Sequence, residues 1–267
     1  MHRSGKKPKP AKHAAKPAGA PHARGRQDRS NNSVYIFGLH AVREALTNPS
    51  RQLLALACTE NAASRLDASA HASLQTTIVQ TRELDRLVGA DAVHQGVVLT
   101  ARPLAAPQFD PMQHQMWVVL DQVTDPHNVG AIMRSAVAVG ASAILTTHRH
   151  APAESGTLLK SASGCFEHID YIQINNLADG LRNLGKAGVF RIGLDSDGAL
   201  PFEQALSNRY PNAPIAIVLG AEGKGLRALT REHCDQLARF DLPGPIRSLN
   251  VSNAAVLALY LTLKQSQ

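Results

Sequence analysis

Short apolar runs recur through residues 34–102 at the spacing of β-strands, and segments of helical spacing separate them. This alternation predicts a small α/β domain. Three prolines without apolar periodicity follow, and they predict a linker at 103–115. The expected strands of the small domain are 34–37, 51–59, 76–81 and 95–103, and its expected helices are 39–46, 62–70 and 82–88.

From residue 116 onward, strand and helix patterns alternate regularly, which predicts an α/β domain over 116–267. Strands that alternate with helices indicate a mostly parallel sheet with helices on both faces. The expected strands are 116–121, 141–147, 168–174, 189–196, 214–220 and 236–242. The expected helices are 129–139, 177–188, 226–233 and a last one from about 251.

Composition narrows the class of protein. The chain has 267 residues and 44% hydrophobic content, enough for two modest cores. The longest apolar run, 254–263, is well short of the roughly 20 residues that a bilayer requires, and no secretory signal opens the chain. Three widely separated cysteines fit a reducing compartment. We therefore expect a cytoplasmic protein, and the twelve histidines form no pattern that predicts a metal.

Positive charge is concentrated at the N-terminus. The first 30 residues hold nine Lys or Arg and one acid, whereas the rest of the chain holds 19 basic and 20 acidic residues. Rich in Pro, Ala and Gly, residues 1–33 are predicted to form a disordered basic tail. Such a tail is either a solubilising extension or a polycation that attracts nucleic acid.

The first candidate for chemistry is DPHNVGAIMRSAVAVGA, at 125–141. Its spacing predicts a helix that is apolar nearly all round and therefore buried, with Arg134 as its only charge. A buried guanidinium needs an anion, because an unpaired buried charge is very costly. One interpretation is an internal ion pair with Glu222, Asp121 or Asp125. The other is a guanidinium that faces a phosphate or a reacting oxygen.

The second candidate is LGAEGKGLR, in which a buried strand leads into a glycine-rich turn. Its glycine spacing matches neither the dinucleotide fingerprint nor the P-loop. Gly220, Gly223 and Gly225 either let the backbone approach a ligand, with Glu222 projecting from the turn, or simply form a tight strand-to-helix turn with an exposed glutamate.

The third candidate is SLNVSN, where Ser248, Asn250, Ser252 and Asn253 directly precede the last apolar run. One such residue suffices to cap a helix. The surplus indicates either the polar lining of a site or a buried polar network that fixes the last helix.

Together DPHNVGAIMRSA, LGAEGKGL and SLNVSNA, in this order and spacing, resemble the three motifs of the SpoU (TrmH-like) family of SPOUT RNA 2′-O-ribose methyltransferases, over 116–264. Residues 34–102, with IFGLHAVREAL and HQGVV, are similar to the small L30e-like substrate domain of the subgroup that methylates a guanosine of 23S rRNA. The resemblance implies an α/β fold with a deep C-terminal trefoil knot, a homodimer through the knotted domain, and RNA as partner.

The resemblance also implies S-adenosyl-L-methionine as cofactor. The family's catalytic polar positions match Asn128, Arg134, Glu222, Ser248 and Asn250. Its cofactor-binding positions match Gly220, Phe240, Leu242 and Leu249. Because arginine is always protonated, we expect Arg134 to stabilise the developing alkoxide and a nearby RNA phosphate, while Ser248 and Asn250 orient the ribose and the methionine end.

The sequence thus predicts methylation of a ribose 2′-hydroxyl in RNA, with a guanosine of 23S rRNA as the expected target. A tRNA ribose is the alternative substrate, and the two-domain layout favours rRNA by analogy. A catalytically silent RNA-binding protein of ribosome assembly, with the same fold, is the alternative from another class. A Rossmann-type nucleotide enzyme is disfavoured by the glycine spacing.

Overall fold

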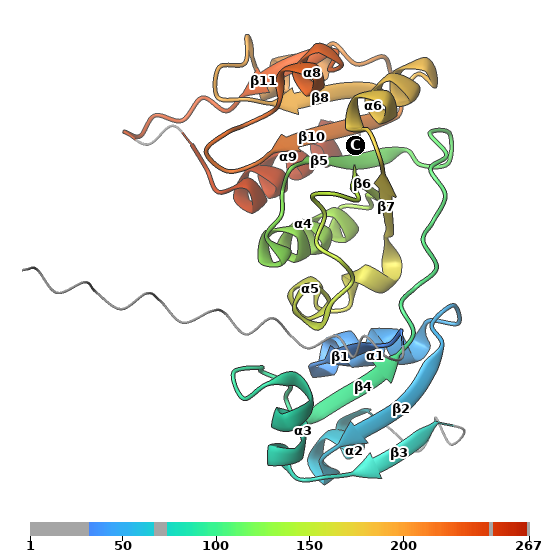
Figure 1. Ribbon diagram of the computed structural model, residues 1–267. Coiled ribbons are helices and arrows are strands. Elements are labelled where there is room, and N and C mark those ends of the chain that lie inside the picture. The colour runs from blue at the N-terminus through green and yellow to red at the C-terminus, as the bar shows by residue number, and fades with distance from the viewer. Residues whose placement is uncertain (1–31, 67–73, 246–247, 266–267) are drawn as a thin grey trace, which may run out of the picture.

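The computed structural model describes residues 32–66, 74–245 and 248–265, and in it the chain forms two separate β-sheets (Figure 1). The predicted basic tail lies outside these residues, apart from its last two positions. No helix among the described residues is long and apolar enough to cross a membrane.

The N-terminal sheet has four strands in the order β1-β4-β2-β3. β4 pairs antiparallel with β1 and β2, whereas β3 runs parallel to β2. The strands are β1 (Val34–Phe37), β2 (Leu53–Cys58), β3 (Gln75–Ile78) and β4 (Val97–Ala101). The helices are α1 (Leu39–Thr47), α2 (Glu60–Leu66) and α3 (Thr81–Val88).

The C-terminal sheet has seven strands in the order β7-β6-β5-β10-β8-β11-β9, and every pair in it is parallel. This confirms the predicted α/β class with a parallel sheet. The strands are β5 (Met116–Asp121), β6 (Ala143–Thr147), β7 (Asp170–Ile174), β8 (Phe190–Leu194), β9 (Leu200–Pro201), β10 (Ile215–Gly220) and β11 (Gln236–Arg239). The helices are α4 (Pro126–Ala138), α5 (Gly156–Ala162), the 3-10 helix η2 (Cys165–His168), α6 (Leu177–Lys186), α7 (Phe202–Ser207), α8 (Ala228–Glu232) and α9 (Val251–Gln265).

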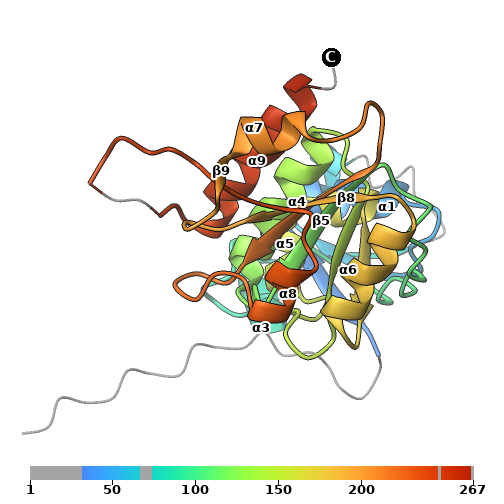
Figure 2. The ribbon, with the colours of Figure 1, turned by 90° about the horizontal axis from the view of Figure 1, so that it is seen from above.

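Alternate residues of β5 belong to two different apolar cores, one on each face of this sheet. Trp117 and Val119 pack with α6, whereas Val118 and Leu120 pack in the core that includes residues of α4, α5, α7 and α9. Figure 2 shows α6 and α8 on one side of the sheet and α4, α7 and α9 on the other. Burial on both faces explains why the strand sequences are almost continuously apolar.

Several elements differ from the sequence prediction. α4 starts at Pro126 and not at 129, because Asp125 caps it by accepting a hydrogen bond from the His127 backbone N–H at 3.0 Å, and proline suits the first helical turn. The last helix begins at Val251, as predicted. α5, η2 and α7 were not predicted, because helices this short depend on packing rather than on their own apolar periodicity.

Candidate functional site

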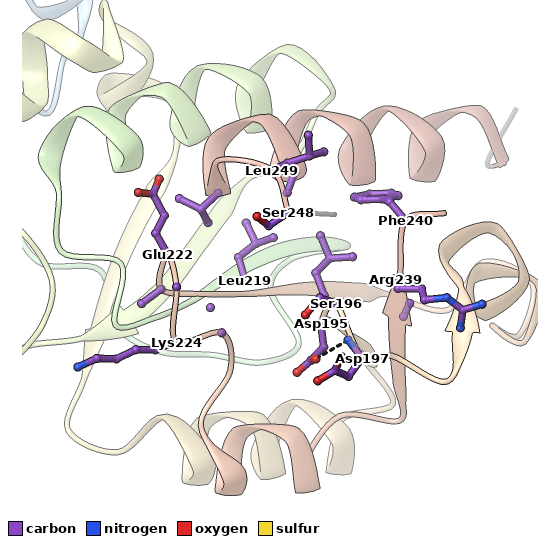
Figure 3. A pocket seen from close by; sticks show the side chains of 18 of the residues that line it. Asp195, Ser196, Asp197, Leu219, Glu222, Lys224, Arg239, Phe240, Ser248 and Leu249 are labelled. Atoms are coloured by element: carbon purple, nitrogen blue, oxygen red, sulfur yellow. Dashed lines mark hydrogen bonds between the residues drawn. The ribbon is translucent and has the colours of Figure 1, made fainter. Parts of the chain in front are cut away.

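A pocket opens where the carboxyl ends of three neighbouring strands meet (Figure 3). β8 contributes Leu194 and the following Asp195, β10 contributes Leu219, and β11 leads into Phe240. Its volume is about 360 Å³, which falls in the range of small-molecule sites. In open parallel sheets, the crevice at the carboxyl ends of the strands is where ligands bind.

The four residues predicted to hold a cofactor all line this pocket: Gly220, Phe240, Leu242 and Leu249. Glu222 and Ser248, from the predicted catalytic set, line it as well. Figure 3 shows Glu222 at one end of the pocket and Phe240 at the other, with Leu249 and Ser248 between them. The second and third motifs therefore enclose one cavity, although some 20 residues separate them in the chain.

Asn128, Glu222 and Asn250 form a hydrogen-bonded cluster beside the pocket. The Asn128 side-chain amide donates to Glu222 Oε1 at 3.0 Å. The Asn250 side-chain amide donates to the same oxygen, and to Asn128 Oδ1 at 3.1 Å. The three residues come from three segments that are 94 and 28 positions apart in the chain. All three motifs that the sequence singled out thus meet at one point.

Asn250 also caps α9. Its Oδ1 accepts hydrogen bonds from the Ser252 backbone N–H at 2.9 Å and from the Ser252 hydroxyl at 2.5 Å, while its backbone carbonyl accepts from the Ala254 N–H. One amide side chain therefore serves the helix through its oxygen and the cluster through its nitrogen. The alternative of a buried polar network is wrong, because Ser248, Asn250 and Asn253 are exposed.

The prediction that Arg134 is buried is wrong. α4 buries Val129, Ile132 and Met133, but the side of the helix that carries Arg134 and Ala138 is exposed. Small alanines made the helix look apolar all round in sequence, yet alanine is tolerated at helix surfaces. The guanidinium therefore remains hydrated and needs no internal anion.

The proposed internal ion pair of Arg134 is also absent among the described residues. Glu222 accepts the two amides, Asp125 caps α4, and the buried Asp121 pairs with Arg227. Arg134 is not among the residues that line the pocket. Six positions on from Asn128, it is displaced by roughly 9 Å along α4 and turned by roughly 240° around it.

Cys165 of η2 lies near this arginine. Burial raises the pKa of the Cys165 thiol, and the positive charge of Arg134 partly opposes that rise. Arg134 therefore lies on the α5–η2 side of α4, away from the pocket of its own chain. Within one chain, the structure brings together four of the five predicted catalytic residues at or beside the pocket, and leaves Arg134 apart.

Gly220 is required by the fold of the glycine-rich turn itself. A Cβ built on Gly220 would lie 2.3 Å from the backbone carbon of Gly225. The turn closes on itself through a bridge between Ala221 and Gly225, whose N–H donates to the Ala221 carbonyl at 2.9 Å. The tight-turn interpretation and the ligand interpretation are therefore compatible, because the closed turn carries Glu222 and borders the pocket.

Two ion pairs that sequence analysis missed hold the edges of the pocket. Arg231 of α8 donates to Asp195 at 2.7 Å, which fixes the loop after β8. Arg227 donates to the fully buried Asp121 through its backbone N–H at 2.9 Å and its side-chain Nε at 2.6 Å, which fixes the end of the glycine-rich turn. Asp121 ends β5 and Asp195 directly follows β8. Their place at the carboxyl ends of parallel strands could have identified both as residues near a binding site.

Asn250→Ala is expected to lower methyl transfer strongly and to destabilise the chain by about 1 kcal/mol, because it removes both the cluster amide and the cap of α9. Urea unfolding and transfer of labelled methyl measure the two effects separately. The matched control is Asn253→Ala, an exposed asparagine in the first turn of the same helix. Equal activity of the two variants would contradict a role for the cluster.

The chain is similar to known protein families over both of its units. Residues 115–260 match the model of the SpoU rRNA methylase family, and residues 35–107 match the substrate-binding domain of RNA 2′-O-ribose methyltransferases. The chain belongs to the SpoU rRNA methylase family. All the site residues discussed above lie within the first of these two matches.

Relatives of this SpoU family member are similar to it over nearly the whole of their own length. The 23S rRNA (guanosine-2′-O-)-methyltransferase RlmB of Ralstonia nicotianae is 36% identical over 88% of this chain and 97% of its own. RlmB of Vibrio parahaemolyticus is 34% identical over 88% and 98%. The crystal structure of an AdoMet-bound rRNA methyltransferase from Sinorhizobium meliloti has the same fold, with a TM-score of 0.75 over 89% of each chain at 23% identity.

Proposed function

We propose that this protein transfers a methyl group from S-adenosylmethionine to the 2′-hydroxyl of a ribose in RNA, at a guanosine of 23S rRNA. The observation that carries the proposal is the meeting of three sequence motifs at one pocket, with the Asn128–Glu222–Asn250 cluster beside it. The near full-length similarity to proteins named 23S rRNA (guanosine-2′-O-)-methyltransferase supports the choice of substrate.

The residues of the pocket suit the proposed cofactor. Leu219, Phe240 and Leu249 offer apolar surface for an adenine, and the ends of β8, β10 and β11 bring backbone N–H and C=O groups to the pocket. Asp197 lines the same end of the pocket and supplies negative charge for a cationic ligand, whereas Asp195 is paired with Arg231. No group of three His, Cys, Asp or Glu side chains that could hold a metal ion is found in the part of the chain that the structure describes.

The cofactor, when bound, supplies a methyl group on a positively charged sulfur, which is open to in-line attack by a hydroxyl oxygen. The chain's own residues then have to align the ribose, since alignment is the main requirement of such a step. Ser248 at the pocket wall would hold the ribose in place, and Asn250, whose amide is bonded to Glu222 and Asn128, would hold Glu222 in position beside it. Among the described residues, Asn128 and Asn250 both donate to Oε1 of Glu222, so Oε2 remains available to accept a hydrogen bond from the 2′-hydroxyl.

Arg134 would stabilise the developing negative charge and bind an RNA phosphate. Because it is exposed and lies outside the pocket of its own chain, we propose that a second copy of the chain brings the arginine and the site together in a homodimer. The exposed apolar side chains of α9, namely Val256, Leu257 and Tyr260, support an interface on this side of the sheet.

We further propose the finer features of the fold that the family implies. Residues 34–102 would be the L30e-like RNA-binding domain and 116–267 the methyltransferase domain, joined by a linker at 103–115. The two sheets and the two family matches support this division. The C-terminal segment of the methyltransferase domain would be threaded into a deep trefoil knot. Action on ribosomal RNA would place the protein in the cytoplasm.

Deleting residues 1–30 should weaken RNA binding most at low salt, because nine basic residues in that segment are expected to contact phosphates non-specifically. Titration of an RNA fragment at several salt concentrations measures this as a shallower dependence of affinity on salt. A salt dependence identical to that of the full chain would show that the tail is only a solubilising extension.

Mapping ribose methylation across rRNA and tRNA in cells that lack the protein tests the substrate. The proposal expects one 2′-O-methylguanosine of 23S rRNA to disappear. Loss of a tRNA methyl group would instead support the alternative substrate, and an unchanged methylation map would support the catalytically silent assembly protein.

A further inference from the structure

A buried ion cluster joins the N-terminal unit to the methyltransferase unit. Arg51 lies between α1 and β2. Its guanidinium forms ion pairs with Glu154 and Glu167, which belong to the C-terminal unit. The contact with Glu167 is two-pronged, with Nε donating to Oε2 at 3.2 Å and a terminal nitrogen donating to Oε1 at 2.5 Å. A further hydrogen bond of 3.0 Å runs to the carbonyl of Arg102.

The three side chains are almost completely removed from water. Their exposed fractions are 0% for Arg51, 2% for Glu167 and 12% for Glu154. Burial raises the pKa of Glu154, and the charge of Arg51 opposes that rise. Removing one partner of such a group is costly, because the remaining buried charges lose their compensation.

Neutral donors complete the cluster from the N-terminal side and from the connecting segment. The Asn48 amide donates to Glu167 Oε2 at 2.7 Å, and the Leu104 backbone N–H donates to Glu154 Oε2 at 2.9 Å. Each carboxylate is therefore bonded both by the arginine and by a second group. Buried charges that are this fully bonded fix one geometry rather than many.

The two glutamates lie on either side of α5, so Arg51 binds both ends of the segment 154–168, called here the α5–η2 platform. Glu154 directly precedes the cap of α5, and Glu167 lies in η2, which follows it. The start of α5 also lies against β1, because a Cβ on Gly156 would be 2.5 Å from the Phe37 ring. Figure 1 shows α5 lying directly beside β1 and α1.

The platform in turn is packed closely against the helix that carries Asn128. Where α5 crosses α4, a Cβ on Gly130 would lie 2.5 Å from the Ser161 Cβ, so the two helices approach as closely as glycine allows. The Ser161 hydroxyl also lies 3.0 Å from Nδ1 of His127, the neighbour of Asn128. A continuous chain of tight contacts thus leads from the N-terminal unit to the candidate site.

We propose that Arg51 is a positioning residue for methyl transfer: by locking the N-terminal unit onto the α5–η2 platform, it sets the position from which that unit presents RNA to the pocket. This inference rests on the proposed function. It assigns no chemical step to Arg51, which touches neither the pocket nor its lining. An RNA held by a freely moving N-terminal unit would reach the pocket in many orientations, few of them productive.

The test replaces Arg51 with methionine, which keeps the length of the side chain and removes its charge. Paired fluorescent labels on non-natural amino acids at the exposed positions 82 and 183 report the distance between the two units. In R51M we expect the narrow distance distribution of the wild type to broaden. We also expect kcat/KM for a 23S rRNA fragment to fall roughly ten- to hundredfold, because KM rises. The kcat at saturating RNA and the affinity for S-adenosylmethionine should not change.

Arg191→Met is the control, since Arg191 forms a partly buried pair with Asp235 inside the C-terminal unit alone. It should lower stability without changing the distance or KM. Arg51→Lys should restore part of both readouts, and it replaces R51M if that variant does not fold. An unchanged distance distribution or an unchanged KM would overturn the inference. A wild-type protein without methyl transfer would overturn the proposed function instead. The distance measurement would still show whether Arg51 fixes the N-terminal unit against the α5–η2 platform.

Discussion

Arg134→Ala is expected to reduce methyl transfer by roughly 10²–10³-fold, the usual cost of removing one charge-stabilising group from an active site. The variant should fold as stably as the wild type and bind S-adenosylmethionine equally well. The structural reason is that Arg134 is exposed, forms no ion pair or side-chain hydrogen bond with the described residues, and lies outside the pocket. Thermal melting, calorimetric titration with the cofactor, and transfer of labelled methyl measure the three quantities.

Arg182→Ala serves as the control for this prediction. Arg182 is also an exposed helical arginine, but it lies on α6, on the opposite face of the sheet, where it pairs with Asp179. Its loss should leave methyl transfer unchanged. If R134A retained full activity, or if it lost cofactor binding together with activity, the proposed electrostatic role of Arg134 would be wrong.

Gly220→Ala is expected to cause the second large effect, a loss of cofactor affinity of roughly tenfold or more. The added Cβ would sit 2.3 Å from the backbone carbon of Gly225, and backbone cannot move aside as the end of a long side chain can. The turn must therefore open, which displaces Glu222 and the pocket wall. Overpacking of this kind also costs about 1–3 kcal/mol of folding free energy.

Gly244→Ala is the control, because a Cβ there would meet no atom within 4 Å. Each variant adds one methyl group, G220A in the glycine-rich turn and G244A just before the third motif. A difference in cofactor affinity between them therefore reports the effect of opening the turn. Calorimetric titration with S-adenosylmethionine gives the affinities. Equal affinities for G220A and the wild type would show that the turn tolerates opening and does not shape the pocket.

Much of the fold follows from local patterns in the sequence. β5 has the predicted bounds, the last helix starts at the predicted residue, and the parallel sheet follows from regular strand–helix alternation. The pattern was least informative for short helices such as α5 and α7. Their positions depend on contacts with distant elements, such as the close crossing of α5 and α4 at Gly130.

The candidate site was only partly predictable. Gly-rich and polar motifs identified the segments, but only the fold shows that Asn128, Glu222 and Asn250 share hydrogen bonds. Helical periodicity misplaced Arg134, because it counts alanine as apolar although a small side chain needs little burial. The Arg51 cluster was not predicted at all, since its partners are 103 and 116 positions away in the chain.

The pocket at the ends of β8, β10 and β11 is proposed to hold a methyl donor beside a ribose hydroxyl. The most direct measurement incubates the purified protein with tritiated S-adenosylmethionine and unmodified 23S rRNA, and then digests the RNA to nucleosides. The label should appear in 2′-O-methylguanosine alone. Label on a base, or a protein that neither binds the donor nor labels the RNA, would contradict it.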